Sequence, residues 1–457
     1  MFRSINPATG DTIADRLELT AAELEAKVAK AAERFASWRF TPLAERTRLL
    51  EQIAEVFDAR IEPMARMASE EMGKTLVSSR AELKKCAAAF RYYAQNGEAF
   101  LRPVPIAGAN GEVHLLPLGP ILAVMPWNFP YWQVVRFLAP TILAGNVGLL
   151  KHASIVQGVA GLIEEAVIAA GAPDGLFQNL AIKSGSVAGL IADDRIAAVT
   201  LTGSEGAGRS VAEAAAMALK KVVLELGGSD PFIVMPSADL DEAAKVAVTA
   251  RTQNSGQSCV CAKRMIVHAD IFEAFAERFT KGMLAARAGD PMDAASDMGP
   301  LSSFEQRRTV LDQIAAAKAA GAKLVGGEAI PGKGAYIGGG VLTHVPIESE
   351  IAKEEIFGPI AMLFRVADID EAIRLANDSP FGLGSSVWTR DKAEEAKFIA
   401  AIDAGMTAVN QMLASAPEAP FGGIKRSGHG RELGPWGLHE FMNIKTVLRS
   451  GSSGGPK

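Results

Sequence analysis

Apolar residues recur at spacings of three and four through roughly residues 20–100 of the chain. This spacing places apolar side chains on one face of a helix. Ala, Glu, Leu and Lys, which favour helices, dominate the same stretch. The clearest apolar face is formed by Leu49, Leu50, Ile53, Val56 and Phe57. The pattern therefore predicts that this part of the chain is mainly helical.

From about residue 113 the pattern changes, and short runs of strand-forming residues alternate with helical stretches. Strands separated by helices of roughly 10–15 residues indicate βαβ units and a parallel sheet. A second alternating set follows Cys259 and ends near residue 430. The sequence thus predicts an α/β fold with two domains. The first expected strands lie at 115–124, 147–151, 176–181, 196–202, 221–226, 231–235 and 263–268.

A polar, hairpin-like segment lies at 103–116. It is rich in proline and then runs Ala-Gly-Ala-Asn-Gly, a composition typical of a turn. We expect it to pair with a C-terminal strand at Ile444–Leu448. The Gly/Ser-rich tail at 450–457 is expected to be partly disordered.

Composition and charge narrow the possible functions of the chain. Its 457 residues are too many for one ordinary domain, and 49% of them are hydrophobic. The net charge of −5 gives no electrostatic footprint for nucleic acid or for an anionic membrane. No apolar run reaches the roughly 18 residues needed to span a bilayer, and residues 1–7 lack the apolar core of a secretory signal. We therefore expect a cytoplasmic protein that binds neither nucleic acid nor membranes.

Cysteine is the first candidate for chemistry. Cys86, Cys259 and Cys261 are too few for a disulfide framework and suit a reducing cytosol. Cys259 follows a Gly-Gln-Ser run, whose small residues let a ligand approach the backbone closely. A thiolate there can attack a carbonyl carbon and leave a thioester that water hydrolyses. Taken alone, Cys259 is more typical of a small buried apolar residue.

Two further polar residues lie among apolar neighbours or prolines. Glu225 lies near the end of an apolar run, where burial would raise its pKa toward the range of a general base. A salt-bridged strand end is an equally good interpretation. Asn128 lies in the rigid turn PWNFP, where its amide can donate to a developing oxyanion. An ordinary turn asparagine is the commoner alternative.

The segment Thr202–Gly208, TGSEGAG, follows an expected strand and precedes an expected helix. Such a turn exposes backbone N–H groups that bind anions. Its spacing departs from GxGxxG, so it is a weak dinucleotide fingerprint, and helix capping by Ser204 explains it nearly as well. The histidines are scattered, with no HExxH or paired CxxC, so no metal site is expected.

Taken together and in order, these segments resemble the aldehyde dehydrogenase superfamily across essentially the full chain. Within it, the chain is most similar to bacterial NAD(P)-dependent succinate-semialdehyde dehydrogenases. The segments that carry this closer resemblance are PWNFPYWQVVRF, LELGGSDPFIV and LHEFMNIKTV. The motifs that carry the resemblance are PWNFP at 126–130, LLKHAS at 149–154, LTGS at 201–204, LELGG at 224–228, GQSC at 256–259, EEIFGP at 354–359 and PFGGIKRSGHGRE at 420–432.

The resemblance implies a role for each candidate residue. Cys259 would be the nucleophile, Glu225 the base that activates the deacylating water, and Asn128 with the Cys259 backbone N–H the oxyanion hole. The thiohemiacetal would collapse with hydride transfer to the nicotinamide, and water would hydrolyse the thioester, so coenzyme A is not needed. The residues implied in cofactor binding are Trp127, Lys151, Ser154, Gly203, Ser204, Leu226, Glu355 and Phe357.

The LLKHAS motif bears on the choice of cofactor. Many NAD-preferring relatives have a glutamate three residues after its lysine, and an acidic group there would repel a 2′-phosphate. This chain has Ser154 at that place and a positive charge at Lys151. We therefore expect that NADP is preferred and that NAD is the second cofactor.

Substrate choice depends on Arg136, which follows Trp132 by four residues and so shares a helix face with it. A guanidinium near the aldehyde suits a distal carboxylate, although a surface or inter-subunit salt bridge is the alternative. By resemblance, Trp132 and Ser415 line the same pocket. Many succinate-semialdehyde dehydrogenases have a second arginine six residues before the nucleophile, where this chain has Gln253, so carboxylate binding would be weaker.

The resemblance also implies a reversible disulfide between Cys261 and the nucleophile, with an inert neighbour as the alternative. It further implies an aldehyde dehydrogenase fold in three parts. These are a Rossmann-like dinucleotide-binding domain (1–102 and 117–226), an α/β catalytic domain (227–430), and a small β oligomerisation element (103–116 and 431–457).

The expected function is the oxidation of succinate semialdehyde to succinate by a homodimer or homotetramer. A broader aldehyde dehydrogenase that acts on glutarate semialdehyde or aliphatic aldehydes is the alternative. A more remote alternative is an inactive binding protein with the same fold.

Overall fold

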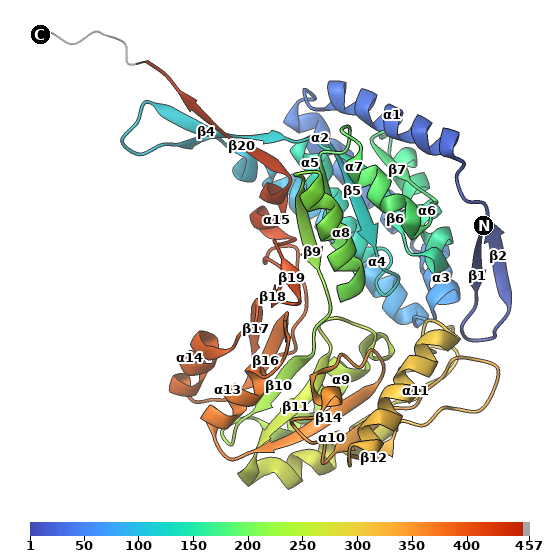
Figure 1. Cartoon of the computed structure of the whole chain (residues 1–457), viewed down its shortest axis with the longest axis vertical. Coiled ribbons are helices and arrows are strands. Elements are labelled where there is room, and N and C mark those ends of the chain that lie inside the picture. Colours follow the sequence, from blue (N-terminus) through green and yellow to red (C-terminus); the bar gives the residue numbers. More distant parts are fainter. Residues whose placement is uncertain (451–457) are drawn as a thin grey trace, which may run out of the picture.

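The computed structural model describes residues 1–450, and the upper half of Figure 1 contains a six-stranded sheet. Its strands are β19 (Gly428–His429), β9 (Lys221–Glu225), β8 (Ala198–Thr202), β5 (Pro120–Met125), β6 (Val147–His152) and β7 (Phe177–Asn179), in this spatial order. All neighbours are parallel except β19, which is antiparallel to β9. The chain runs outward from β5 to β7 and then returns to β8 and β9 on the other side. The strand order therefore reverses between β5 and β8, where sheets of this kind bind ligands.

Helices cover this sheet and confirm the helical pattern at 20–100 (Figure 1). The apolar face predicted around Leu50 and Phe57 is buried in the core. These helices are α1 (Ala21–Trp38), α2 (Leu43–Ala59), α3 (Ile61–Met72), α4 (Leu76–Leu101), α5 (Trp132–Ala144), α6 (Gln157–Ala169), α7 (Val187–Ala192) and α8 (Glu205–Met217).

A seven-stranded sheet occupies the lower half of Figure 1. Its spatial order is β12 (Lys323–Gly326), β13 (Gly340–Thr343), β14 (Ile360–Val366), β11 (Ala262–His268), β10 (Asp230–Val234), β16 (Gly384–Trp388) and β17 (Met406–Val409). Only β12, the edge strand beside β13, is antiparallel. The helices of this half are α9 (Leu240–Thr252), α10 (Phe272–Ala285), α11 (Phe304–Ala319), α12 (Glu350–Lys353), α13 (Ile369–Asn377) and α14 (Lys392–Ala401).

Two apolar clusters cover the two faces of the seven-stranded sheet. Successive side chains of a strand point to opposite faces, so Ile233 joins one cluster while Phe232 and Val234 join the other. All three side chains are fully buried. Burial on both faces explains why this strand appears in the sequence as a continuous apolar run.

A three-stranded sheet projects from the body as an arm (Figure 1). It consists of β3 (Val104–Pro105), β4 (Gly111–Pro117) and β20 (Met442–Leu448). The antiparallel pairing of β20 with β4 confirms the pairing expected between the hairpin segment and the C-terminal strand. Residues 451–457, on which the rest of the expected oligomerisation element and the expected disordered tail fall, lie outside the described residues. The division of the chain into three parts stays a prediction, which the separate sheets support.

The single strand expected at 115–124 is wrong. The structure divides it into β4, which ends at Pro117 in the arm, and β5, which begins at Pro120 in the six-stranded sheet. Gly119 lies between them with φ +155°, and a Cβ there would come within 2.8 Å of the Ala197 Cβ. The apolar pattern continues across this turn, which is why the pattern alone did not reveal it.

The remaining elements are short. The strands β1 (Phe2–Ile5) and β2 (Thr12–Arg16) form a hairpin, and β15 (Phe381–Gly382) pairs with β18 (Ile424–Lys425). Helix α15 (Gly434–Glu440) precedes the arm strand β20. Within residues 1–450, none of the helices combines the length and the apolar character that crossing a bilayer requires.

Candidate active site

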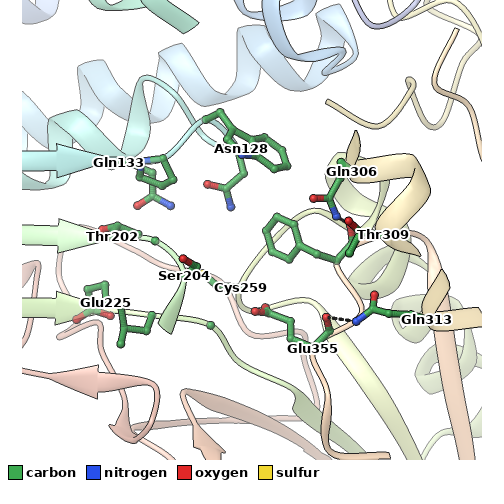
Figure 2. A pocket seen from close by; sticks show the side chains of 16 residues that line it. Asn128, Gln133, Thr202, Ser204, Glu225, Cys259, Gln306, Thr309, Gln313 and Glu355 are labelled. Atoms are coloured by element: carbon green, nitrogen blue, oxygen red, sulfur yellow. Dashed lines mark hydrogen bonds between the residues drawn. The ribbon is translucent and has the colours of Figure 1, made fainter. Parts of the chain in front are cut away.

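A cavity of about 280 Å³ lies at the C-terminal ends of β5, β8 and β9, beside the reversal of strand order (Figure 2). We call it the strand-end cavity. Its wall is formed by Pro126, Trp127, Asn128, Gln133, Thr202, Gly203, Ser204, Glu225, Leu226, Gly227, Cys259, Gln306, Thr309, Gln313, Glu355 and Phe357. Nine of these residues end one of the three strands or follow directly after it, so the sheet positions them by its topology. The three predicted catalytic residues therefore share one cavity with most of the predicted cofactor residues.

Local geometry in this cavity suits a dinucleotide. Ser204 is the N-cap of α8, and its side chain accepts from the backbone N–H of Ala207, so the helix N-terminus faces the cavity as an anion site. A Cβ at Gly227 would overlap the carboxylate of Glu355, so a larger residue at this position would displace the Glu355 side chain. Both interpretations of the TGSEGAG segment, capping and anion binding, are compatible with this arrangement.

Two predicted cofactor residues do not line the strand-end cavity. Lys151 is buried near the end of β6, and burial lowers its pKa. Ser154 begins a short 3₁₀ turn just after the strand, and its side chain is exposed. Lys151 lies within β6, the strand beside β5, and Ser154 lies two residues after that strand ends. Their part in cofactor binding stays a prediction.

Sequence reasoning missed several polar residues of the strand-end cavity, and three of them lie on one helix. Gln306, Thr309 and Gln313 lie on α11 at spacings of three and four, so one helix face presents them together. Gln306 Nε2 donates to the Phe357 carbonyl, and Gln313 Nε2 donates to the Glu355 carbonyl. The spacing was visible in the sequence, but any exposed helix has a polar face of this kind.

Asn128 is held between the turn after β5 and the cysteine segment. The side-chain Nδ2 of Asn128 donates to the backbone carbonyl of Gln257 at 3.2 Å. The backbone carbonyl of Asn128 accepts from Asn254 Nδ2 at 2.7 Å. The side chain is buried, and its Oδ1 has no hydrogen-bond partner within the described residues. The amide is thus fixed near the nucleophile with one N–H remaining to donate, as an oxyanion hole requires.

The backbone before Cys259 adopts an uncommon conformation. Asn254 and Ser255 have φ values of +50° and +57°, and Gly256 has +74°. A side chain at Gly256 would collide with the Gly358 carbonyl. Left-handed residues in series are costly and are retained where surrounding structure holds them, commonly at functional sites. Here the bend delivers Cys259 to the cavity.

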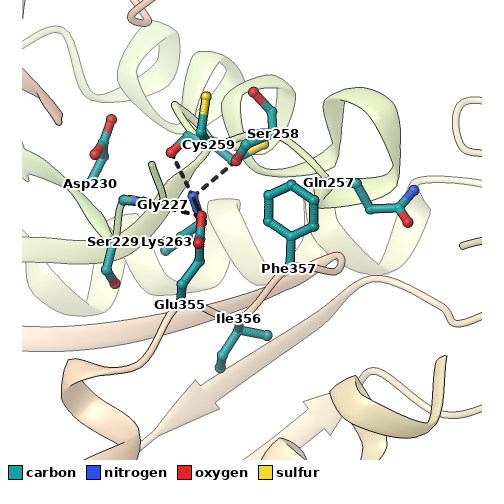
Figure 3. A network of polar contacts seen from close by, with 12 residues as sticks. Gly227, Ser229, Asp230, Gln257, Ser258, Cys259, Lys263, Glu355, Ile356 and Phe357 are labelled. Atoms are coloured by element: carbon teal, nitrogen blue, oxygen red, sulfur yellow. Dashed lines mark hydrogen bonds and ion pairs between the residues drawn. The ribbon is translucent and has the colours of Figure 1, made fainter. Parts of the chain in front are cut away.

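Buried Lys263 ties the cysteine segment to Glu355 (Figure 3). Its Nζ donates to the carbonyls of Ser258 at 2.9 Å and Cys259 at 2.8 Å, and lies 3.1 Å from Glu355 Oε1. Glu355 also accepts from the Gly228 backbone N–H at 3.2 Å. One buried cation thereby fixes a predicted cofactor residue relative to the nucleophile. Lys263 is the second residue of β11, and a lysine in a buried strand was a sequence signal for such a role.

Glu225 ends β9 and is buried, and neither of its carboxylate oxygens has a hydrogen-bond partner within residues 1–450. Burial raises the pKa of Glu225 well above its usual value, and the nearby carboxylate of Glu432 acts in the same direction with a smaller effect. Arg136 and Arg431 act in the opposite direction. A raised pKa makes the ionised carboxylate a stronger base than that of an exposed glutamate, which suits a general base.

Burial also dominates the chemistry of Cys259. It raises the pKa of the thiol to about 12, and the positive charges of Arg136 and Lys263 oppose this effect. At neutral pH the thiol therefore keeps its proton in this structure, and attack on a carbonyl requires a base.

A second cavity, of about 70 Å³, meets the first at Cys259 and Gln133, which line both. We call it the Lys85 cavity. Its wall is formed by Lys85, Phe129, Trp132, Gln133, Arg136, Gln253, Ser258, Cys259, Val260, Leu413, Ala414, Ser415 and Phe421. It thus contains all three predicted substrate residues. It also contains Gln253, and Lys85, which sequence reasoning missed.

Arg136 and Trp132 share a face of α5, as predicted, and both line the Lys85 cavity. The Arg136 Nε lies 2.6 Å from a carboxylate oxygen of Glu432, and both side chains are buried. Its guanidinium also lies 4.4 Å above the ring of Phe421. The partner is thus an internal carboxylate, and binding of a substrate carboxylate by Arg136 stays a prediction.

Cys261 is fully buried, and its thiol donates to the Gln253 carbonyl at 3.8 Å. Both Cys259 and Cys261 are free thiols in the structure. The disulfide between them stays a prediction.

Known proteins similar to this chain share its length and its fold. Residues 1–447 match the aldehyde dehydrogenase family. The succinate-semialdehyde dehydrogenase [NADP(+)] 1 of Mycobacterium tuberculosis is 50% identical over 450 residues, which cover 97% of this chain and 98% of that protein. The succinate-semialdehyde dehydrogenase [NADP(+)] of Mycobacterium avium is 49% identical over 463 residues, which cover 99% of this chain and 98% of that protein.

A solved structure gives the same result in three dimensions. The succinic semialdehyde dehydrogenase from Streptococcus pyogenes, in complex with NADP⁺, superimposes with a TM-score of 0.96 at 38% identity. The match covers 98% of this chain and 100% of that one. With the cysteine, glutamate and asparagine gathered at the strand-end cavity, these similarities lead to one conclusion: the chain belongs to the aldehyde dehydrogenase family.

Proposed function

We propose that this protein oxidises succinate semialdehyde to succinate with NADP as its cofactor. The observation that carries the proposal is the position of Cys259 between two cavities. One lies where such a sheet binds dinucleotides, and the other is lined by the cationic side chains of Lys85 and Arg136. The mycobacterial relatives, at 49–50% identity, carry this activity in their names.

Each catalytic residue has one task in this reaction. The Cys259 thiol gives up its proton to water and attacks the aldehyde carbon as the thiolate. The oxyanion that forms accepts hydrogen bonds from Asn128 Nδ2 and the Cys259 backbone N–H. The nicotinamide, when bound, supplies the hydride acceptor that makes this an oxidation. Glu225 then removes a proton from water, which attacks the thioester and releases the acid and the Cys259 thiol.

The cofactor would be held mainly by groups at the strand ends. Ser204 and the N-terminus of α8 suit the pyrophosphate, and Glu355, fixed by Lys263, suits the nicotinamide ribose. Trp127 and Phe357 pack edge to face at 5.7 Å between ring centroids and suit the nicotinamide end of the cavity. NADP is favoured over NAD because Ser154 carries no negative charge.

The test is the initial rate of NADPH and NADH formation with succinate semialdehyde, glutarate semialdehyde, butanal and hexanal. We expect the highest kcat/KM for succinate semialdehyde with NADP. Equal or better rates with the uncharged aldehydes would replace the proposal with a broader aldehyde dehydrogenase. No turnover of any aldehyde would favour the inactive scaffold, against which the gathering of Cys259, Glu225 and Asn128 counts.

We also propose that the protein is a cytoplasmic homodimer or homotetramer. The arm supports the assembly, because β20 is an edge strand and its Ile444 and Leu448 side chains are 64% and 67% exposed. Exposed apolar edges of this kind invite pairing with another chain. Sedimentation of the wild type beside a double variant, Ile444→Lys with Leu448→Lys, tests it: smaller assemblies are expected for the variant, and unchanged assembly would refute this role of the arm.

A further inference from the structure

Lys85 lies on α4, far in sequence from every motif that carries the family resemblance, and its amino group reaches the substrate side of Cys259. Its Nζ donates to Ser415 Oγ at 2.8 Å and lies 4.2 Å above the ring of Trp132. Trp132 Nε1 donates to the same Ser415 oxygen at 2.9 Å. Three side chains from separate parts of the chain thus form one polar cluster on the cavity wall.

The hydrogen bonds in this cluster decide which kind of group can bind to it. A serine hydroxyl offers two lone pairs and one proton, whereas the lysine ammonium and the tryptophan indole can only donate. Because Lys85 and Trp132 occupy both lone pairs of Ser415, the hydroxyl proton remains to be donated. Lys85 keeps further N–H groups as well. The cluster presents only donors, and an ionised carboxylate is a ligand that only accepts.

The other cation on the cavity wall is already paired. The Arg136 Nε lies 2.6 Å from Glu432, deep in the protein. Lys85 Nζ, in the part of the chain that the structure describes, is bonded to Ser415 and to no carboxylate. A charged amine that is largely removed from water without a counterion is costly, so an anionic ligand there gains a strong, charge-assisted hydrogen bond.

We propose that Lys85, together with the Ser415 hydroxyl, binds the distal carboxylate of the aldehyde substrate and so determines its specificity. This inference rests on the proposed function, since it assigns the carboxylate of succinate semialdehyde to named donors. Lys85 supplies from α4 the second positive charge that Gln253 does not supply. The Lys85 cavity, at about 70 Å³, has room for roughly five water-sized groups, which suits a short substrate.

Titration of Lys85 gives the inference a second readout. Burial lowers its pKa to about 8, and the charges of Arg136 on α5 and of Lys74 act in the same direction. Cys86 and Glu82, both on α4, act in the opposite direction. In the free enzyme the amine is therefore charged below about pH 8 and neutral above it. The kcat/KM for a carboxylate-bearing aldehyde should fall as the pH rises through this value, beyond any change seen with butanal.

The experiment compares Lys85→Met, Lys85→Arg and the control Lys84→Met, which removes the exposed neighbouring lysine. For Lys85→Met we expect kcat/KM with succinate semialdehyde to fall about 30-fold, through KM, because a charge-assisted hydrogen bond is lost. Activity with butanal should be retained, which shows that the variant is folded. Lys85→Arg should keep most of the preference and move the alkaline decline to higher pH, and Lys84→Met should behave as wild type.

The outcomes separate this inference from the proposed function. If the wild type prefers succinate semialdehyde over butanal and Lys85→Met keeps that preference, the role of Lys85 is overturned and the proposed function stands. If the wild type instead prefers glutarate semialdehyde over pentanal, the proposed substrate fails, and the same variants decide the role of Lys85 with that aldehyde. A wild type without preference for either carboxylate overturns both.

Discussion

The two cavities that meet at Cys259 are built in different ways. The strand-end cavity is formed largely by short turns that follow β5, β8 and β9, so its residues occur in compact motifs. The Lys85 cavity is formed by side chains from α4, α5 and the loop of Ser415, which lie far apart in the sequence. The sheet topology dictates the first cavity, and tertiary packing assembles the second.

This difference explains what could be predicted from the sequence. Asn128, Ser204 and Glu225 were candidates because each lies in or beside a glycine or proline turn near the end of an expected strand, and the family resemblance implied their roles. Lys85 was missed because a lysine on an amphipathic helix usually faces solvent, and nothing local distinguishes it from exposed Lys84. The partner of Arg136 was missed because Glu432 lies almost at the other end of the chain.

In the fold, too, features set by the local sequence were predicted and features set by distant contacts were not. Helices α1 to α4 followed from periodicity, because one face of each packs on the core. The break between β4 and β5 did not, because Gly119 lies inside an apolar run and only its close approach to Ala197 requires the turn. The arm pairing was expected from composition, but its register is set by contacts between segments far apart in the chain.

The largest expected effect follows from a change at Glu225, which lines the strand-end cavity and serves only the hydrolysis of the thioester. Glu225→Gln should lower kcat by about 10²–10⁴-fold, because the water that attacks the thioester loses its base. Since burial raises the pKa of Glu225, wild-type kcat should fall as the pH decreases and the carboxylate gains its proton. Steady-state pH profiles of both proteins check this; a variant that keeps the acidic decline would assign it to another group.

The second test concerns Lys263, which ties the cysteine segment to Glu355 of the strand-end cavity. Lys263→Met should reduce the free energy of unfolding by about 2–4 kcal/mol, because two buried carbonyls and Glu355 lose their donor. The Kd for NADP should also rise, since Glu355 is no longer held. Urea unfolding and cofactor titration measure both effects against the exposed-site control Lys84→Met. Unchanged stability would show that water replaces the lysine at no cost.

The third test concerns only the choice between NADP and NAD. Ser154→Glu should weaken NADP binding by about 10-fold or more and leave NAD binding nearly unchanged, because the new carboxylate repels the 2′-phosphate. Isothermal titration with each cofactor measures this without any substrate; Ser154→Gln, of equal size and no charge, is the control. An equal loss for both cofactors would indicate a steric effect and would remove the argument for NADP preference.

The smallest expected effect is the reversible loss of activity when the cysteines Cys259 and Cys261 are oxidised. Peroxide should lower wild-type activity several-fold as Cys259 and Cys261 form a disulfide and the peroxide is reduced to water, and dithiothreitol should restore it. Cys261→Ala should lose activity without recovery, since Cys259 then proceeds to irreversible acids. Equal recovery in both proteins would make Cys261 an inert neighbour.

The most direct test of the central claim is to observe the covalent intermediate. Glu225→Gln mixed with succinate semialdehyde and NADP should accumulate one succinyl group on Cys259, detected by intact mass and located by peptide mapping, while Cys259→Ala remains unmodified. The same adduct should be absent without the cofactor. NADPH formation without any adduct on Cys259, or an adduct on another residue, would contradict the assignment of Cys259 as the nucleophile between the two cavities.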